Sequence, residues 1–274
     1  MSDSHVTSDL RRWVAEQSDL GHPPDALLGS MLASGWSASA AERALSEVLL
    51  GRVIEAQQAG GLPAAVRVPD VSASRGGVQV IATMHKPRVV VLSGLLSHDE
   101  CDELVALARP RMARSETLEL TTGGGAIHES RTSQGMFFDR EENPLCSRIE
   151  RRIADLLDWP LDHGEGLQVL HYGVGAEYKP HYDYFDPDQP GTVPVLKRGG
   201  QRVASVVMYL NTPRQGGGTV FPDVQFEVAP IKGNAVFFSY DRPDPITRSL
   251  HGGSPVIEGE KWVATKWLRE RRFE

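Results

Sequence analysis

The C-terminal half of the chain constrains the fold most, because short apolar segments alternate there with turn residues. These segments are 167–172, 203–210, 218–221, 226–228, 235–239 and 262–268. Each is as long as a typical strand, and glycine and proline punctuate the intervals between them. The chain of 274 residues holds 27 glycines and 18 prolines, a share that favours a turn-rich β architecture. Regularly spaced short strands of this kind predict a sandwich or a barrel.

The N-terminal segment has a different, helical pattern. Leu10, Trp13 and Val14 lie at helical spacing, Pro24 opens a second helical segment, and Ser37 is a candidate N-cap for a third. The following stretch is rich in glycine and proline and predicts a linker. The sequence therefore predicts a three-helix unit over 1–57, a linker over 58–77 and a β-rich domain with flanking helices over 78–274.

Two further helices are expected inside the large domain, after predicted strands at 78–84 and 89–96. Ser97 and Glu100 form a capping box that begins a helix running to about residue 109. Residues 144–157 carry apolar side chains on one face and predict a second, amphipathic helix. The loops at 121–135 and 184–200 are expected to close over a bound substrate.

Composition excludes several classes of protein. The net charge is −7, which disfavours a broad nucleic-acid interface. We expect no membrane span, because no apolar run reaches about 18 residues, and no secretory signal at the N-terminus. Cys101 and Cys146 are the two cysteines of the chain and lack C-x-x-C spacing, so no disulfide framework is expected. We therefore expect a cytoplasmic protein.

The sharpest chemical feature is the segment His181-Tyr182-Asp183. Residues i and i+2 of a strand point to the same face, so the imidazole and the carboxylate could bind one metal ion. Two histidines and one carboxylate that leave positions open are typical of non-haem Fe(II). The pair alone is common by chance, and a hydrogen-bonded surface pair is the competing interpretation.

A third ligand and an anion site are suggested further along the chain. His251 lies 70 residues after His181, with several predicted strands between them, and a barrel could bring the two together. Lys261 follows ten residues later at the start of an apolar strand. A lysine inside an apolar cavity needs an anion, which a dicarboxylate cosubstrate would supply.

These residues stand in segments that resemble the prolyl 4-hydroxylase family of Fe(II)- and 2-oxoglutarate-dependent dioxygenases. The resemblance runs from about residue 89 to the end of the chain. The segments that carry it are 167–183, Gly200-Gln201-Arg202, Met208-Tyr209-Leu210-Asn211, 216–222, and His251 with Lys261-Trp262 and Trp267.

The resemblance implies a role for each matching residue. It makes His181, Asp183 and His251 the iron ligands and Lys261 the partner of the distal (C5) carboxylate of 2-oxoglutarate. It places Tyr172 and Thr219 near the same carboxylate. Tyr178, Arg202 and Trp267 match residues that meet the substrate; for Arg202, a structural pair with a carboxylate is the alternative. His171, next to Tyr172 on the predicted strand, should face away from the metal.

The implied fold is a double-stranded β-helix, a jelly-roll barrel. The implied reaction hydroxylates C4 of a prolyl residue in a peptide or protein, and it consumes O2 and 2-oxoglutarate and releases succinate and CO2. Ascorbate is admitted as an additional cofactor, and the implied partner is a proline-containing peptide or protein.

Three alternatives stay open at this point. The same cofactors could serve hydroxylation of a free amino acid or a small natural product. A barrel that had lost turnover would be a binding module, although all four expected ligand residues are present. The N-terminal helices could recruit a protein partner.

Overall fold

The computed structural model describes residues 7–19, 22–59, 63–71, 74–114, 117–118, 125–126 and 133–274. The predicted loop at 121–135 falls mostly outside these residues. The chain forms two compact units, Met1–Pro63 and Ala64–Glu274.

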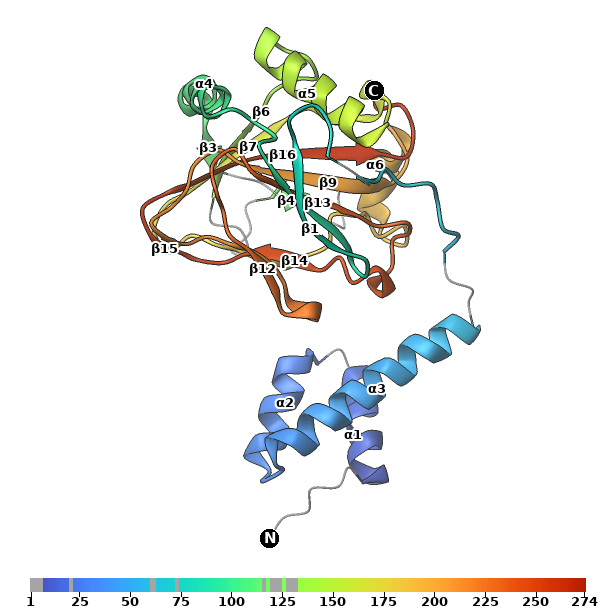
Figure 1. Cartoon of the computed structure of the whole chain (residues 1–274). Coiled ribbons are helices and arrows are strands. Elements are labelled where there is room, and N and C mark those ends of the chain that lie inside the picture. The colour runs from blue at the N-terminus through green and yellow to red at the C-terminus, as the bar shows by residue number, and fades with distance from the viewer. Residues whose placement is uncertain are drawn as a thin grey trace. The chain divides into compact units, whose positions relative to one another are not determined.

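The first unit consists of three helices (Figure 1): α1 (Ser8–Asp19), α2 (Pro24–Ala33) and α3 (Ala38–Ala59). All three were predicted. Ser37 caps α3, because its Oγ accepts a hydrogen bond from the Ala40 amide at 3.3 Å. Apolar side chains from the three helices share one small core that includes Val14, Met31 and Ala44. The three helices therefore share an apolar cluster of their own.

The second unit is built on two antiparallel sheets. The large sheet has the order β1 (Gln79–Met84), β2 (Arg88–Ser93), β13 (Ala235–Ser239), β9 (Arg202–Tyr209), β16 (Lys261–Arg269), β7 (Gln168–Tyr172), β6 (Gln134–Phe137) and β3 (Ala113–Arg114). The small sheet has the order β12 (Phe226–Val228), β11 (Thr219–Phe221), β14 (His251–Gly253) and β8 (Tyr178–His181). Two small two-stranded sheets accompany them, β10 (Gln215–Gly216) with β15 (Val256–Glu258) and β4 (Thr117–Leu118) with β5 (Gly125–Ala126). Spatial neighbours are seldom consecutive in sequence, which is the topology expected of a jelly roll, with the strands in two facing sheets.

Helices cover one face of the large sheet. The helices α4 (His98–Ala108) and α5 (Pro144–Leu157) lie together on that face in Figure 1. The capping box of α4 is present as predicted, with the Ser97 side chain accepting from Glu100 N–H and the Glu100 side chain accepting from Ser97 N–H. Alternate residues of the strands pack under these helices in the main core.

The other face of the large sheet is turned toward the small sheet. There Leu170, Tyr209, Phe221 and Phe238 belong to a second apolar cluster. Two cores on opposite faces of one sheet explain why its central strands are buried on both sides. The second core is the one that surrounds the candidate site.

Part of the segment predicted as a linker belongs to the second unit. Helix α3 runs to Ala59, and residues after Ala64 pack along the large sheet. Val71 is buried in the main core, the Val66 amide donates to the carbonyl of Asp241 at 2.8 Å, and Arg88 pairs with Asp70 at 2.6 Å. The buried Val71 and the ion pair between Asp70 and Arg88 thus hold this segment against the large sheet.

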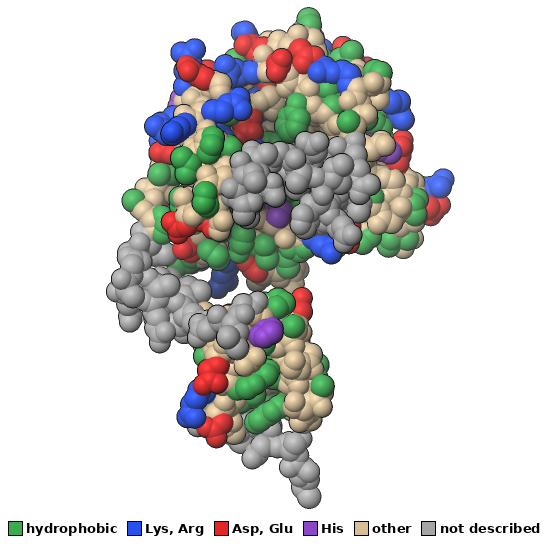
Figure 2. Space-filling view, turned by 180° about the vertical axis from the view of Figure 1, so that it is seen from behind, with side chains coloured by type: hydrophobic (Ala, Val, Ile, Leu, Met, Phe, Trp, Pro, Cys, Tyr) green, Lys and Arg blue, Asp and Glu red, His purple; other side chains and the backbone are tan. Residues whose placement is uncertain are grey.

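Basic and acidic side chains are interspersed over the described part of the face of the second unit drawn in Figure 2. Among the described residues, Cys101 and Cys146 are buried free thiols. Within the same residues, every helix is too short or too polar to cross a lipid bilayer.

Candidate metal centre

A pocket lies between the inner faces of the two sheets. The candidate ligands His181, Asp183 and His251 all line it, and so does Lys261. Four more predicted site residues join them: Tyr172, Tyr178, Thr219 and Trp267. The fold therefore brings into one pocket eight of the nine residues that the sequence singled out.

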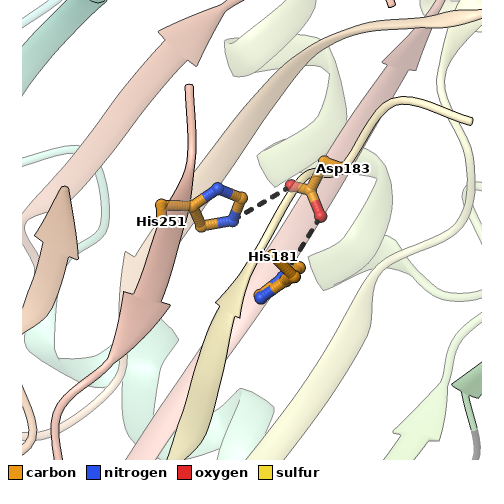
Figure 3. Close-up of side chains that lie close together, drawn as sticks. All are labelled: His181, Asp183 and His251. Atoms are coloured by element: carbon orange, nitrogen blue, oxygen red, sulfur yellow. Dashed lines mark ion pairs between the residues drawn. The ribbon is translucent and has the colours of Figure 1, made fainter. Parts of the chain in front are cut away.

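The candidate metal ligands meet because β8 and β14 are neighbours. His181 and His251 stand directly opposite each other in the antiparallel register. The sequence predicted that His181 and Asp183 lie on one strand. In the structure β8 ends at His181, and Asp183 follows just beyond the strand end. One ligand atom from each residue lies within 4.8 Å of the others. Figure 3 shows both imidazole rings turned toward the Asp183 carboxylate.

Backbone carbonyls fix which nitrogen of each imidazole faces the centre. His181 Nδ1 lies 2.9 Å from the carbonyl of Lys179, and His251 Nδ1 lies 2.9 Å from the carbonyl of Ser249. A carbonyl only accepts hydrogen bonds, so each Nδ1 carries the proton and each Nε2 presents a lone pair. The two Nε2 atoms stand 3.6 and 3.5 Å from the oxygens of Asp183. This is the arrangement in which histidines bind metals.

Charge in the centre is also suited to a cation. Burial lowers the pKa of His251 to about 4, so its ring is neutral at pH 7. Burial alone would raise the pKa of Asp183, but the adjacent His251 and His181 outweigh this effect and hold that pKa well below its ordinary value. Two imidazole nitrogens and one carboxylate oxygen are the donor set of a two-histidine, one-carboxylate Fe(II) site.

The Asp183 carboxylate is itself held by the large sheet. Ser205 of β9 donates a hydrogen bond from its Oγ to Asp183 Oδ2 at 2.6 Å, and the Tyr240 hydroxyl lies 3.0 Å from the same Oγ. All three side chains are buried. A polar network therefore crosses the space between the two sheets and reaches one of the candidate ligands.

Lys261 brings a positive charge into the same pocket. It is the first residue of β16, stands opposite Tyr172 of β7 and is 4% exposed. Burial lowers its pKa to about 8, and the charge of Glu227 opposes this shift. Within the described chain its ammonium has neither a hydrogen bond nor an ion pair. A buried, unpaired ammonium calls for an anionic ligand, so the pocket fits a carboxylate at this position.

Tyr172 and Thr219 border the same region from opposite sheets. The Lys261 Nζ lies 5.5 Å from the centre of the Tyr172 ring. Thr219 Oγ1 accepts a hydrogen bond from the hydroxyl of Tyr209 on β9 at 2.8 Å. Because the threonine acceptor is occupied in this way, its own hydroxyl proton is directed elsewhere, and a carboxylate in the pocket could receive it.

The three predicted substrate residues differ in their surroundings. The Tyr178 ring stacks on the His181 ring with centroids 3.7 Å apart, and Trp267 lines the pocket. Arg202 instead donates from Nε and Nη2 to Glu165 at 2.7 and 2.8 Å. Its guanidinium also lies 3.8 Å from the Trp267 ring centroid. Arg202 thus forms the structural pair with a carboxylate that the sequence offered as an alternative, and its guanidinium packs against the Trp267 ring.

His171 faces away from the centre, as predicted. Its Nε2 lies 2.8 Å from Glu260, and its ring packs against Trp262 with centroids 4.5 Å apart. Alternation along β7 places this ring on the opposite side of the strand from Tyr172.

Sequence reasoning missed several residues at the site. Gln168 and Thr265 line the pocket, Ser205 and Tyr240 support Asp183, and Glu165 holds Arg202. Strand alternation could have placed Ser205 on the inner face of β9 with Tyr209. The partners of Tyr240 and Glu165 have no such local signal, because they come from distant parts of the chain.

Comparison with known proteins agrees with this geometry. A family model described as the 2OG-Fe(II) oxygenase superfamily matches residues 167–269. Prolyl 4-hydroxylase 5 of Arabidopsis thaliana is 41% identical over 210 residues, which cover 69% of this chain and 70% of that protein. Prolyl 4-hydroxylase 1 of the same plant is 41% identical over 215 residues, covering 72% of this chain and 74% of the relative.

A solved structure extends the comparison to the fold. The viral collagen prolyl hydroxylase vCPH from Paramecium Bursaria Chlorella virus-1, in its 2OG complex, is 29% identical with a TM-score of 0.50. The match covers 66% of this chain and 95% of the viral one. The donor set and the buried lysine agree with this degree of similarity. The chain therefore belongs to the prolyl 4-hydroxylase family of Fe(II)- and 2-oxoglutarate-dependent dioxygenases.

Proposed function

We propose that this enzyme hydroxylates C4 of a prolyl residue within a peptide or protein, with Fe(II) held by His181, Asp183 and His251. The observation that carries the proposal is the placement of this donor set and the unpaired Lys261 in one buried pocket. The 41% identity to proteins named prolyl 4-hydroxylases supports the substrate class.

Each residue of the pocket then has a defined task. Bound Fe(II) and 2-oxoglutarate supply the oxidation, in which O2 is consumed, 2-oxoglutarate becomes succinate and CO2, and one oxygen atom enters a C–H bond. The carbonyls that hold each Nδ1 proton keep both Nε2 atoms free for the metal. Lys261 holds the distal carboxylate of the cosubstrate, with Tyr172 and Thr219 beside it. Apolar walls that include Leu170, Val207 and Val263 exclude water.

An aromatic surface beside the pocket favours a peptide over a free amino acid. Trp267 lines the pocket, and its ring centroid lies 6.5 Å from that of Phe137 on β6. Phe137 is 53% exposed, whereas its neighbours Met136 and Phe138 are buried. Exposed aromatic rings are the usual partners of extended, proline-rich segments, whose polyproline II form exposes ring faces and backbone carbonyls.

The discriminating experiment compares free L-proline with a blocked proline-rich peptide at equal concentration. Product is measured by mass spectrometry as a gain of about 16 Da that requires both iron and 2-oxoglutarate, which is the mass of one inserted oxygen atom. Fragmentation of the product and comparison with a 4-hydroxyproline standard locate the new hydroxyl. We expect turnover of the peptide and little turnover of the free amino acid.

Two control variants sharpen the result. Phe137→Ala should reduce turnover of the peptide, while decarboxylation of 2-oxoglutarate measured without peptide is unchanged, because Phe137 does not line the metal pocket. Ile81→Ala removes another exposed apolar side chain, on β1, and should leave both rates unchanged. Faster turnover of free L-proline than of the peptide would favour the small-molecule alternative and contradict the proposal.

A further inference from the structure

We infer that Ser205 and Tyr240 form a hydroxyl relay that positions the Asp183 carboxylate for metal binding. The inference rests on the proposed role of Asp183 as a ligand. Both residues are positioning residues, because neither offers an atom to the metal itself.

The direction of the relay follows from counting protons. Ser205 Oγ donates to Asp183 Oδ2 at 2.6 Å, because a carboxylate oxygen accepts hydrogen bonds. A serine hydroxyl has a single proton, and that proton is then used. The hydroxyl of Tyr240, 3.0 Å from Ser205 Oγ, must therefore donate to the serine. The relay runs from Tyr240 through Ser205 to Asp183 Oδ2, with each hydroxyl donating once.

The relay completes the support of the metal centre. Each histidine ligand is oriented by a carbonyl of its own strand segment. Asp183 lies beyond the end of β8, where the backbone ladder no longer fixes it. A hydrogen bond from β9 to Oδ2 stops rotation of the carboxylate and leaves Oδ1 as the oxygen for the metal. Groups that orient metal ligands in this way commonly contribute tenfold to hundredfold in affinity.

The surroundings of the relay make it rigid. Ser205 is fully buried, and Tyr240 is 2% exposed. The Tyr240 ring packs against Phe238 and Tyr184, with centroids 6.2 and 6.1 Å apart. Because these contacts involve the ring and not the hydroxyl, Tyr240→Phe should remove the hydrogen bond and keep the packing.

The test measures metal affinity directly, by titrating each full-length variant with Mn²⁺ and following free Mn²⁺ by electron paramagnetic resonance. Ser205→Ala should weaken Mn²⁺ binding about tenfold to a hundredfold. Tyr240→Phe removes one neutral hydrogen bond and should weaken it about twofold to tenfold. Ser239→Ala is the matched control, because that buried hydroxyl, one residue before Tyr240, has no hydrogen-bond partner in the described chain. It should bind Mn²⁺ as the wild type does.

The double variant separates a relay from two independent effects. If Tyr240 acts through Ser205, the variant with both changes should bind Mn²⁺ as weakly as Ser205→Ala alone, because the second change has nothing left to transmit. If the double variant loses Mn²⁺ affinity by the product of the two single losses, the relay is refuted. Thermal unfolding of each variant without metal checks that the fold is kept.

A third variant distinguishes failure of this inference from failure of the proposed function. His251→Ala should lose more than a hundredfold in Mn²⁺ affinity, because a ligand is removed. If His251→Ala binds Mn²⁺ like the wild type, the metal centre itself is wrong. If His251→Ala loses binding but Ser205→Ala does not, the metal centre stands and the relay is refuted.

Discussion

We predict that the buried Lys261 makes binding of 2-oxoglutarate dependent on pH. Burial lowers the pKa of this ammonium to about 8, so in the empty pocket the lysine is charged below that pH and neutral above it. Only the charged form pairs with a carboxylate. With a pKa of about 8, the apparent affinity should fall about tenfold between pH 7 and pH 9, because the charged fraction falls by that factor.

The variant Lys261→Met tests the charge while keeping most of the side-chain volume. A charge-assisted hydrogen bond contributes roughly 1.5–3 kcal/mol, so the affinity for 2-oxoglutarate at pH 7 should fall roughly tenfold to a hundredfold. The variant should also lose the pH dependence between pH 7 and pH 9. Affinity is measured by isothermal titration calorimetry on the Mn²⁺-loaded protein.

A second ligand provides the control. 2-Oxopentanoate keeps the groups that chelate a metal but lacks the distal carboxylate, so its affinity should be nearly the same for the wild type and Lys261→Met. A wild-type affinity for 2-oxoglutarate that stays flat from pH 7 to pH 9, or that Lys261→Met does not weaken, would refute the assignment of Lys261.

The same substitution should stabilise the ligand-free protein. The shift of the lysine pKa from 10.5 to about 8 means that the folded state disfavours the charged form. This destabilisation is fully present below pH 8, amounts to about 3 kcal/mol, and disappears as the pH rises toward 10.5. Lys261→Met should therefore unfold at a higher temperature than the wild type at pH 7, and this difference should shrink at pH 10.

Three further outcomes are expected. Asp183→Ala should abolish turnover and Mn²⁺ binding but preserve the circular dichroism spectrum; retained iron would contradict the ligand assignment. A chain that begins at Ala64 should keep turnover of a short peptide. A chain that begins at residue 75 should melt at a lower temperature than the one that begins at Ala64, because it lacks the buried Val71. Equal melting temperatures of the two shortened chains would contradict this packing argument. Arg202→Ala should lower the melting temperature as well as peptide turnover, because it leaves the buried Glu165 with only Arg269 as an ion-pair partner; an unchanged melting temperature would count against the structural role.

Elements with a strong local signal were predicted well from the sequence. The helix at 144–157 has the same bounds in the structure, because its apolar periodicity and the capping by Asn143 are local features. The long central strands, β9 and β16, were also expected, since both are long segments in which most side chains are apolar. The bounds of the short strands β8 and β14 were not predicted. They contain Pro180 and Gly252, and they are defined by pairing with distant strands, β8 with β14 and β14 also with β11.

The chemical identity of the site was readable from the sequence, because residue types and their order are local information. His181, Asp183, His251 and Lys261 could be selected without knowing their geometry. The distances between them could not, since His251 reaches His181 only through the pairing of two strands that lie 70 residues apart in the chain.

Only the tertiary structure decided how the site is supported. The sequence left open whether Arg202 contacts the substrate or pairs with a carboxylate, and the fold places the Glu165 carboxylate against its guanidinium. It gave no sign that Ser205 would meet Asp183, because one lies on the large sheet and the other follows a strand of the small sheet. A hydrogen bond depends on distance and angle within a few tenths of an ångström, and such precision arises only when the two sheets are packed face to face. The sequence by itself thus determined which chemical groups the protein carries, and the packing of the sheets determined which of them touch.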